Sequence, residues 1–290
     1  MSFTQNIKAQ LARTQNNCDF CDIAELSSIV KLCTSYAAQK IVISTENEDV
    51  ADRIQFLSER VFSRRIEKIN RNGMFRFYPD LEFFMSEMAP RLLLFNSGKA
   101  EITPLECCRT AYVRGAFLGG GSVSDPKVRY HMEFDTKHEN YAVQLCAVLA
   151  EMGISAKITE RKGHFIVYIK EYEAIADILG IMGAVGAAME LYNISIEKDI
   201  RNSVNRQANC EIANIERTTK TASLQIEAIR KIEKHMPLSN LPDTLSEIAQ
   251  LRIKYPEESL KELGQRLIPP LGKSGVNHRL KRIMEISQRL

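Results

Sequence analysis

The sequence has no apolar run that approaches the ~18 residues a membrane-spanning helix needs. Its first residues, MSFTQNIKAQLARTQ, lack the hydrophobic segment of a secretory signal peptide. We therefore expect a cytoplasmic protein with no membrane partner, whose seven cysteines stay reduced instead of forming a disulfide framework. With 44% hydrophobic and 26% charged residues, the chain has enough apolar side chains for a globular core.

The cysteines also lack the histidine partners of a common zinc site. Cys18-x-x-Cys21 and the adjacent pair Cys107-Cys108 suggest metal ligands, but no nearby histidine completes either group. Two adjacent cysteines, moreover, rarely both bind one ion with good tetrahedral geometry. Because free cysteine is among the most frequently buried residues, we interpret these thiols as core residues and expect no metal and no cofactor.

Acidic residues are scarce in the C-terminal segment 259–290. Glu262 and Glu285 are its only acids, against seven basic residues: Lys261, Arg266, Lys273, Arg279, Lys281, Arg282 and Arg289. The resulting net charge, 7 − 2 = +5, exceeds the +3 of the whole 290-residue chain. A basic surplus concentrated in one short segment is typical of a surface that binds nucleic-acid phosphates.

The same segment has the apolar periodicity of two short helices. The apolar positions are Leu260, Leu263 and Leu267 in the first helix, and Val276, Leu280, Ile283 and Ser287 in a stripe about 40° to either side of Val276 in the second. Between them, the residues IPPLG at 268–272 interrupt the helix, because proline lacks an amide hydrogen. Two helices across a sharp break predict a helix-turn-helix; a solvated helix in an ordinary bundle is the alternative.

The surface of the second helix away from Val276 is polar and basic. We expect four of its residues to read base edges: Ser274, Asn277, His278 and Lys281. Four basic residues are better placed for phosphates, which position a protein without specifying sequence: Lys273, Arg279, Arg282 and Lys261. The predicted partner is double-stranded DNA.

An internal duplication occupies the first two hundred residues. Residues 21–26 (CDIAEL) align with residues 108–113 (CRTAYV) at an offset of 87, and the same offset pairs a predicted strand at 41–43 with residues 128–130. Each half is predicted as helix, strand, helix, two strands, helix, with a glycine-containing turn between the paired strands. Only two copies exist, so the pattern indicates a duplicated α+β domain, not a solenoid.

Glycines mark the first helix of the second half, residues 107–121 (CCRTAYVRGAFLGGG). Gly115 lies within it, and glycine costs about 1 kcal/mol relative to alanine in a helix, so another interaction must compensate. Close approach of a second helix explains Gly115, and helix termination explains Gly120 and Gly121; a phosphate cradle is a third interpretation.

A long helical tract at 200–235 follows the duplication and ends near two prolines. The predicted segments are two repeats, a connecting helix with its linker, and a helix-turn-helix domain: 1–105, 106–200, 201–238 and 239–290.

Three groups of short motifs lie in order along the chain. They are AYVRGAFL at 111–118 with GGSVSDP at 120–126, RN at 201–202 with NR at 205–206 and NCE at 209–211, and KSGVNHRL at 273–280. Through these motifs the chain resembles, over essentially its whole length, the WhiA family of bacterial sporulation and cell-division regulators. The resemblance implies an α+β fold: a degenerate, duplicated LAGLIDADG homing-endonuclease-like domain of αββαββα type, followed by an all-α helix-turn-helix domain.

The resemblance also implies where a nuclease would hold its metal. In active LAGLIDADG enzymes, the first helix of each repeat ends in an acidic residue that binds the catalytic ion. The matching positions here are Gly120 and, at the offset of 87, Cys33, and neither supplies a carboxylate. We therefore expect no enzyme and assign no catalytic residue; the alternatives are a residual metal-dependent endonuclease and a protein-binding scaffold.

We predict a sequence-specific DNA-binding protein. The resemblance implies a monomeric, nucleoid-associated transcription regulator for cell division, chromosome segregation and, in sporulating lineages, sporulation, with other regulators as candidate protein partners. A second DNA surface is predicted on the strands of the duplicated domain, with a solubility surface as the ordinary alternative. Its residues are Arg64, Lys68, Lys157 and Arg161.

Overall fold

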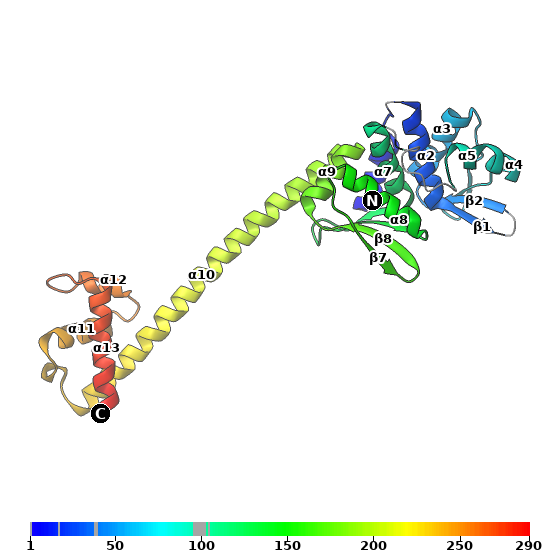
Figure 1. Cartoon of the computed structure of the whole chain (residues 1–290). Helices are drawn as coiled ribbons and strands as arrows, with labels where there is room; N and C mark the ends of the chain where they lie inside the picture. Colours follow the sequence, from blue (N-terminus) through cyan, green and yellow to red (C-terminus); the bar gives the residue numbers. More distant parts are fainter. Residues whose placement is uncertain (1, 17, 38–39, 95–102, 104) are drawn as a thin grey trace. The chain divides into compact units, whose positions relative to one another are not determined.

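The computed structural model describes residues 2–16, 18–37, 40–94, 103 and 105–290. The chain divides into two compact units, Met1–Lys198 and Asp199–Leu290 (Figure 1). The long helix α10 (Val185–His235) begins in the first unit and ends in the second. Across the described ranges, no helix is long and apolar enough to cross a membrane.

The first unit contains two copies of one arrangement. The first copy consists of α2 (Asp19–Cys33), β1 (Thr34–Ala37), β2 (Lys40–Thr45), α3 (Glu48–Phe62), β3 (Ile69–Arg71), β4 (Met74–Phe77) and the helical turns α4 (Leu81–Phe83), η1 (Phe84–Met88) and α5 (Ala89–Arg91). The second consists of α7 (Glu106–Gly120), β5 (Gly121–Val123), β6 (Met132–Thr136), α8 (Glu139–Glu151), β7 (Lys157–Arg161), β8 (His164–Ile169) and α9 (Tyr172–Met182). Both sheets are antiparallel with equivalent strand orders, β1-β2-β4-β3 and β5-β6-β8-β7, which confirms the duplicated αββαββα fold.

Two details of the predicted repeat are wrong. Each copy has an additional short strand, β1 or β5. This strand follows the central helix directly, so no turn residues in the sequence mark where it begins. The counterpart of residues 41–43 is also not the predicted 128–130, which lies in a turn before β6. Buried Ile41 and Ile43 correspond to buried Met132 and Phe134, an offset of 91, because the loop before β6 is longer than the loop before β2.

A further helix, α1 (Phe3–Ala12), precedes the first copy and was not predicted. It begins with a capping box in which the Ser2 hydroxyl accepts a hydrogen bond from the Gln5 amide and the Gln5 side chain accepts one from the Ser2 amide. Ile7 and Leu11 on one side of α1 are fully buried in the core of the first unit.

The two central helices, α2 and α7, pack against each other with their backbones nearly in contact. A Cβ atom at Gly115 would lie 2.3 Å from the carbonyl oxygen of Glu25 and 2.9 Å from the Cβ of Ser28. One at Gly119 would lie 3.0 Å from the Cβ of Leu32. The predicted close approach is confirmed at Gly115, and α7 ends at Gly120 as expected.

A buried ionic network stabilises this helix pair. The Glu25 carboxylate on α2 accepts hydrogen bonds from Nε and Nη2 of Arg53 on α3 at 2.7 and 2.9 Å, and from Nη1 of Arg114 on α7 at 3.1 Å. Burial lowers the pKa of Arg114, and the neighbouring carboxylate opposes that shift. A buried carboxylate is tolerated where several charged donors satisfy it, so this network specifies how three helices meet.

The second unit is entirely helical. After α10 come η2 (Leu238–Asn240), α11 (Asp243–Lys254), α12 (Leu260–Gln265) and α13 (Lys273–Arg289). Their apolar side chains form one separate core that also includes Ile229 and Ile232 from the last turns of α10. The predicted start of this domain at residue 239 therefore leaves out part of its core.

Candidate nucleic-acid interface

Helices α12 and α13 form the predicted helix-turn-helix. A capping box begins α12: the Ser259 hydroxyl accepts a hydrogen bond from the Glu262 amide at 3.3 Å, and the Ser259 amide donates to the Glu262 carboxylate at 2.8 Å. In the turn, a Cβ at Gly264 would lie 2.1 Å from the carbonyl oxygen of Leu271, and one at Gly275 would lie 2.6 Å from the Leu271 side chain. Glycine at both positions therefore allows the two helices to pack closely around Leu271.

Helix α13 has a buried side and an exposed side, as its periodicity predicts. The predicted stripe is buried at all four positions: Val276, Leu280, Ile283 and Ser287. The four residues expected to read bases are all exposed: Ser274, Asn277, His278 and Lys281. Within the described chain, the side chains of these four residues form no hydrogen bond or ion pair. This surface is therefore available to a ligand.

The predicted phosphate-binding residues divide into two groups. Lys261 and Lys273 are exposed, and among the described residues neither has an ion-pair partner. Arg282 forms an ion pair with Glu285 at 3.1 Å, and partly buried Arg279 donates to the carbonyl oxygen of Thr244 on α11 at 3.4 Å. Arg279 thus already helps to hold α13 against α11.

Two other arginines of this unit are structural. The guanidinium of Arg252 is buried and donates to the carbonyl oxygen of Glu258 at 2.7 Å. Arg266 binds the Glu258 carboxylate with both Nε and Nη2, at 2.6 to 3.1 Å, and lies over the ring of Tyr255 at 3.9 Å. The charge of Arg266, which contributes to the +5 counted along 259–290, is therefore neutralised locally.

The N-terminus of α13 provides a second source of positive potential. Its cap is Gly272, no side chain caps the helix, and no acidic residue lies in its first turn. The first amides of a helix lack intrahelical acceptors and carry a partial positive charge, which favours phosphate groups. This end of α13 also carries Lys273 and Ser274.

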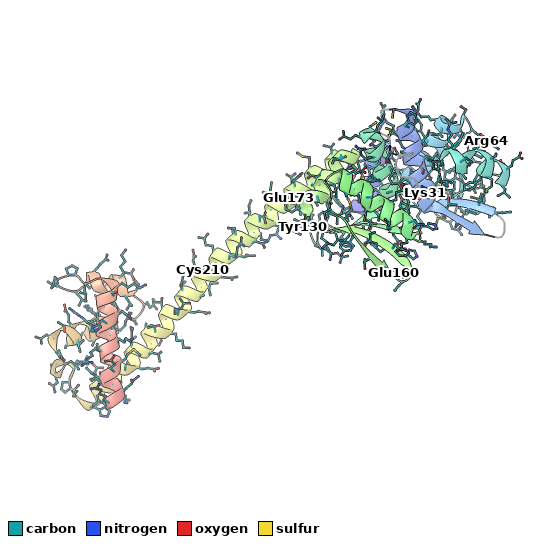
Figure 2. The ribbon with its side chains drawn as sticks, in the orientation of Figure 1. Lys31, Arg64, Tyr130, Glu160, Glu173 and Cys210 are labelled. Carbon is teal, nitrogen blue, oxygen red and sulfur yellow. The ribbon has the colours of Figure 1, made fainter. Side chains whose placement is uncertain are left out.

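The predicted second DNA surface is not assembled as expected. Arg64 and Lys68 lie before β3, not on a strand. Arg64, which is labelled in Figure 2, pairs with Asp80 at 2.8 Å and stacks on Phe83 of α4. Lys68 pairs with Asp52 of α3 and lies over the ring of buried Phe75, which places it on the helix-covered side of the sheet. Neither residue therefore presents an unpaired charge on the open side of the sheet, which is the side that the helices do not cover.

The open sides of the sheets carry a different set of charges. Lys157 and Arg161 are exposed on β7, but the buried-and-exposed alternation expected of a half-buried strand is absent, since every residue of β7 is exposed. The strand register places Lys157 opposite Tyr168 and Tyr168 opposite Glu133, so the acidic Glu133 lies on the same side of the sheet as Lys157. In the first sheet, Arg76 pairs with Ser44 on the side away from the buried phenylalanines; it was not among the predicted residues, although strand alternation indicates it.

The positions matched to nuclease metal ligands cannot easily hold carboxylates. A Cβ at Gly120 would lie 2.5 Å from the carbonyl oxygen of Asp135 on β6, so the backbone itself occupies that space. Cys33, at the end of α2, is buried, and burial raises the pKa of its thiol to about 11.

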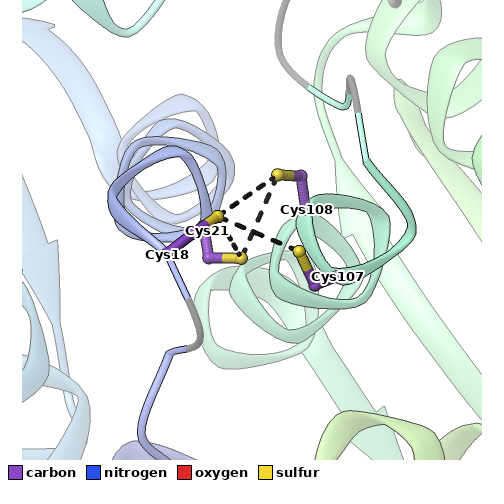
Figure 3. A group of neighbouring side chains, drawn as sticks. All are labelled: Cys18, Cys21, Cys107 and Cys108. Carbon is purple, nitrogen blue, oxygen red and sulfur yellow. Dashed lines mark hydrogen bonds between the residues drawn. The ribbon is translucent and has the colours of Figure 1, made fainter.

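The cysteines are placed differently from expectation. Cys18, Cys21, Cys107 and Cys108 converge at the N-terminal ends of α2 and α7 (Figure 3). The absence of a nearby histidine is therefore no argument against a metal site, because each pair has the other pair, about ninety residues away, as its complement.

Comparison with known proteins agrees with this architecture. The family model for the WhiA LAGLIDADG-like domain matches residues 109–201, and the model for the WhiA C-terminal HTH domain matches residues 204–287. The "Probable cell division protein WhiA" of Clostridium novyi (strain NT) is 37% identical over 313 residues, which cover 100% of this chain and 98% of the relative. The chain belongs to the WhiA family.

Other WhiA proteins support the same assignment. The relative from Thermoanaerobacter pseudethanolicus is 40% identical over 313 residues, covering 100% of this chain and 98% of that protein. The crystal structure of full-length DUF199/WhiA from Thermotoga maritima matches with a TM-score of 0.61 and 28% identity, covering 100% of this chain and 99% of that one. The WhiA family architecture, a LAGLIDADG-like domain followed by a helix-turn-helix, is therefore that of this chain.

Proposed function

We propose that this WhiA-family chain binds double-stranded DNA in a sequence-specific manner through α13. The observation that carries the proposal is that the side chains of Ser274, Asn277, His278 and Lys281, all exposed on α13, have no intramolecular partner within the described chain, while the opposite stripe is buried. A recognition helix of a helix-turn-helix enters the major groove and contacts base edges with its N-terminal residues. Ser274, Asn277, His278 and Lys281 are the proposed base-reading residues.

The phosphate contacts in this proposal come mainly from Lys261, Lys273 and the uncapped N-terminus of α13. These groups are exposed, and no ion pair among the described residues has to break before they bind. Arg282 contributes only if it leaves Glu285, and Arg279 acts mainly by holding α13 in position. Phosphate contacts orient α13 on the duplex, and the base-reading residues supply sequence preference.

The LAGLIDADG-like domain, in our proposal, does not cleave DNA. Two-metal hydrolysis requires carboxylates that hold hard cations, and this chain has glycine and a buried cysteine at the two matched positions. The close approach of the Asp135 carbonyl to Gly120 supports this view, because the local backbone leaves no room for an acid there.

The cellular role that we propose is regulation of transcription in the cytoplasm, at the nucleoid, by a monomer acting on cell division and chromosome segregation, and on sporulation where the lineage sporulates. The names of the relatives, probable cell division proteins, support the division role. Lys157 and Arg161, exposed on β7, are candidates for a weaker and sequence-independent DNA contact. Other transcription regulators are candidate partners.

Binding measurements with two alanine variants test the roles assigned to α13. Loss of one phosphate contact lowers the slope of log affinity against log salt by about 0.9, which is roughly a threefold difference between 50 and 200 mM salt. Lys273→Ala should show this change equally on every sequence. His278→Ala should instead alter the ranking of competitor sequences, since one good base contact contributes about 1–3 kcal/mol of discrimination.

Lys234→Ala provides a charge-matched control. Lys234 is exposed near the end of α10, and one turn before it Lys231 donates to the carbonyl oxygen of Ser287, close to the C-terminal end of α13. The Lys234→Ala substitution should leave the slope of log affinity against log salt unchanged. If Lys234→Ala and Lys273→Ala lower the slope equally, or if His278→Ala weakens all sequences by one factor, α13 is not the reading helix. Nicking of plasmid DNA by the wild-type chain with Mg²⁺ or Mn²⁺ would contradict the non-enzymatic assignment.

A further inference from the structure

Four cysteines meet where the two repeats join. Cys18 is the N-cap of α2, and Cys21 lies in its first turn; Cys107 and Cys108 lie in the first turn of α7. Cys21 and Cys108 occupy equivalent positions in the duplication, separated by 87 residues. Because α2 and α7 are the paired central helices, their N-terminal turns bring the four thiols together (Figure 3).

The sulfur atoms already have the spacing of a mononuclear metal site. The Sγ of Cys18 lies 3.3 Å from that of Cys21, and 3.9 Å from the sulfurs of both Cys107 and Cys108. The Sγ atoms of Cys21 and Cys108 are 4.0 Å apart, and all four lie within 4.8 Å of one another. With zinc–sulfur bonds of about 2.3 Å, a regular tetrahedron has sulfurs about 3.8 Å apart.

We propose that Cys18, Cys21, Cys107 and Cys108 bind one Zn²⁺ ion as a structural site that joins the two LAGLIDADG-like repeats. Four thiolates complete tetrahedral coordination and leave no open position for a substrate, which is the arrangement of structural zinc sites. The donor set of four soft sulfurs selects zinc over hard cations such as Mg²⁺. This proposal is independent of DNA binding by α13.

Burial raises the pKa of the Cys21 and Cys108 thiols and so opposes their thiolates, but two features of the surroundings favour an anion here. Each pair of cysteines lies at a helix N-terminus, where the partial positive charge stabilises an anion. The guanidinium of Arg114 lies close enough to Cys21 for electrostatic attraction. Zn²⁺ with four thiolates has a net charge of −2, so a helix end from each repeat and one nearby cation offset much of that charge.

Three other arrangements of the thiols fit the structure less well. Ordinary core packing does not explain why four sulfurs converge while Cys18 and Cys107 remain partly exposed. An iron–sulfur cluster holds its cysteines farther apart, because its own iron and sulfide ions lie between them. A disulfide between Cys18 and Cys21 would use two of the four thiols and leave Cys107 and Cys108 without a role.

A metal at this place connects parts of the chain that are far apart in sequence. It would tie residues 18–21 to residues 107–108, about one helical turn from Glu25 on α2 and about two turns from Arg114 on α7, which belong to the ionic network. Removal of the ion should therefore loosen the contact between the two repeats. The core of the second unit contains none of these residues and should be unaffected.

Elemental analysis of the full chain, purified without a histidine tag, tests the proposal directly. We expect one zinc ion per chain for the wild type, and loss of zinc to background in Cys18→Ser and Cys107→Ser. Cys210→Ser and Cys146→Ser are matched controls that should retain the ion, because neither residue belongs to the cluster. Equal zinc content in Cys107→Ser and Cys210→Ser overturns the assigned ligands.

A spectroscopic measurement on the wild type avoids reliance on variants that fail to fold. Chelated protein reloaded with Co²⁺ should show the visible absorption of tetrahedral thiolate coordination, which added Zn²⁺ should abolish. Zinc should also raise the Tm of the first unit relative to the chelated protein. No cobalt spectrum, bound iron with acid-labile sulfide, or a Cys18–Cys21 disulfide in freshly purified protein would each overturn the zinc site.

Discussion

Replacing Gly120 with aspartate places a carboxylate at a position where active LAGLIDADG enzymes hold their metal. The Cβ of Gly120→Asp would lie 2.5 Å from the carbonyl oxygen of Asp135 and 3.4 Å from Cδ1 of Leu32. The first distance is below the 3.0 Å under which neighbouring atoms must shift, and the obstructing atom belongs to the backbone of β6. Either the end of α7 or the central strand β6 must therefore move.

The expected loss of stability follows from this overlap. Overpacking in a well-packed interior costs about 1–3 kcal/mol, and one kcal/mol corresponds to roughly 2–4 °C in the Tm of a domain of this size. We therefore expect Gly120→Asp to lower the Tm of the first unit by about 2–12 °C. Gly120→Ala should cause a similar loss, since it introduces the same Cβ without the carboxylate.

Gly180→Ala is the matched control for these variants. Gly180 lies within α9, and a Cβ there would meet nothing within 4 Å. Helical alanine is favoured over glycine by about 0.5–1 kcal/mol, so this variant should raise the Tm slightly. Thermal unfolding of the full chain by circular dichroism would compare all three, and plasmid nicking with Mg²⁺ would test activity. A Gly120→Asp chain with unchanged Tm that nicks plasmid would refute the steric reasoning.

Two further predictions concern buried charges near the central helices. Burial lowers the pKa of Lys31 from 10.5 to about 8. Below that pH the side chain is charged in the folded chain, and burying this charge destabilises the fold. Lys31→Met should therefore stabilise the first unit at pH 7 by at most about 3 kcal/mol, and this gain should fade as the pH rises from about 8 to 10.5. Urea unfolding of both chains at several pH values would measure the gain, and a difference that stays constant with pH would contradict the prediction. Glu25→Gln leaves Arg53 and Arg114 without their carboxylate and should destabilise the unit by about 3–5 kcal/mol in urea unfolding, so an unchanged midpoint would show that the network contributes little.

Local periodicity was sufficient to predict the helix-turn-helix. Val276, Leu280 and Ile283 recur at helical spacing, and all three are buried, because the side of a helix that faces a core is set by residues within one or two turns of each other. Gly115 likewise indicated close helix packing from residue type and position alone, since a helix retains an internal glycine where a neighbouring backbone leaves no room for Cβ.

Short elements and loop lengths were harder to predict. β1 and β5 contain four and three residues and continue directly from a helix, so neither has room for a recognisable alternation. The pairing of residues 41–43 with residues 128–130 failed because a single offset cannot follow a loop that is longer in one copy than in the other.

Long-range assembly depended on tertiary structure alone. Lys68 has the positive charge of a DNA-binding residue, but Asp52 on another element neutralises that charge. Cys18 and Cys107 are 89 residues apart, and their sulfurs meet only because α2 and α7 pack side by side. A sequence pattern determines which side of each helix is apolar or polar. It does not determine which two helices meet or how their turns align, because that depends on the packing of the whole core.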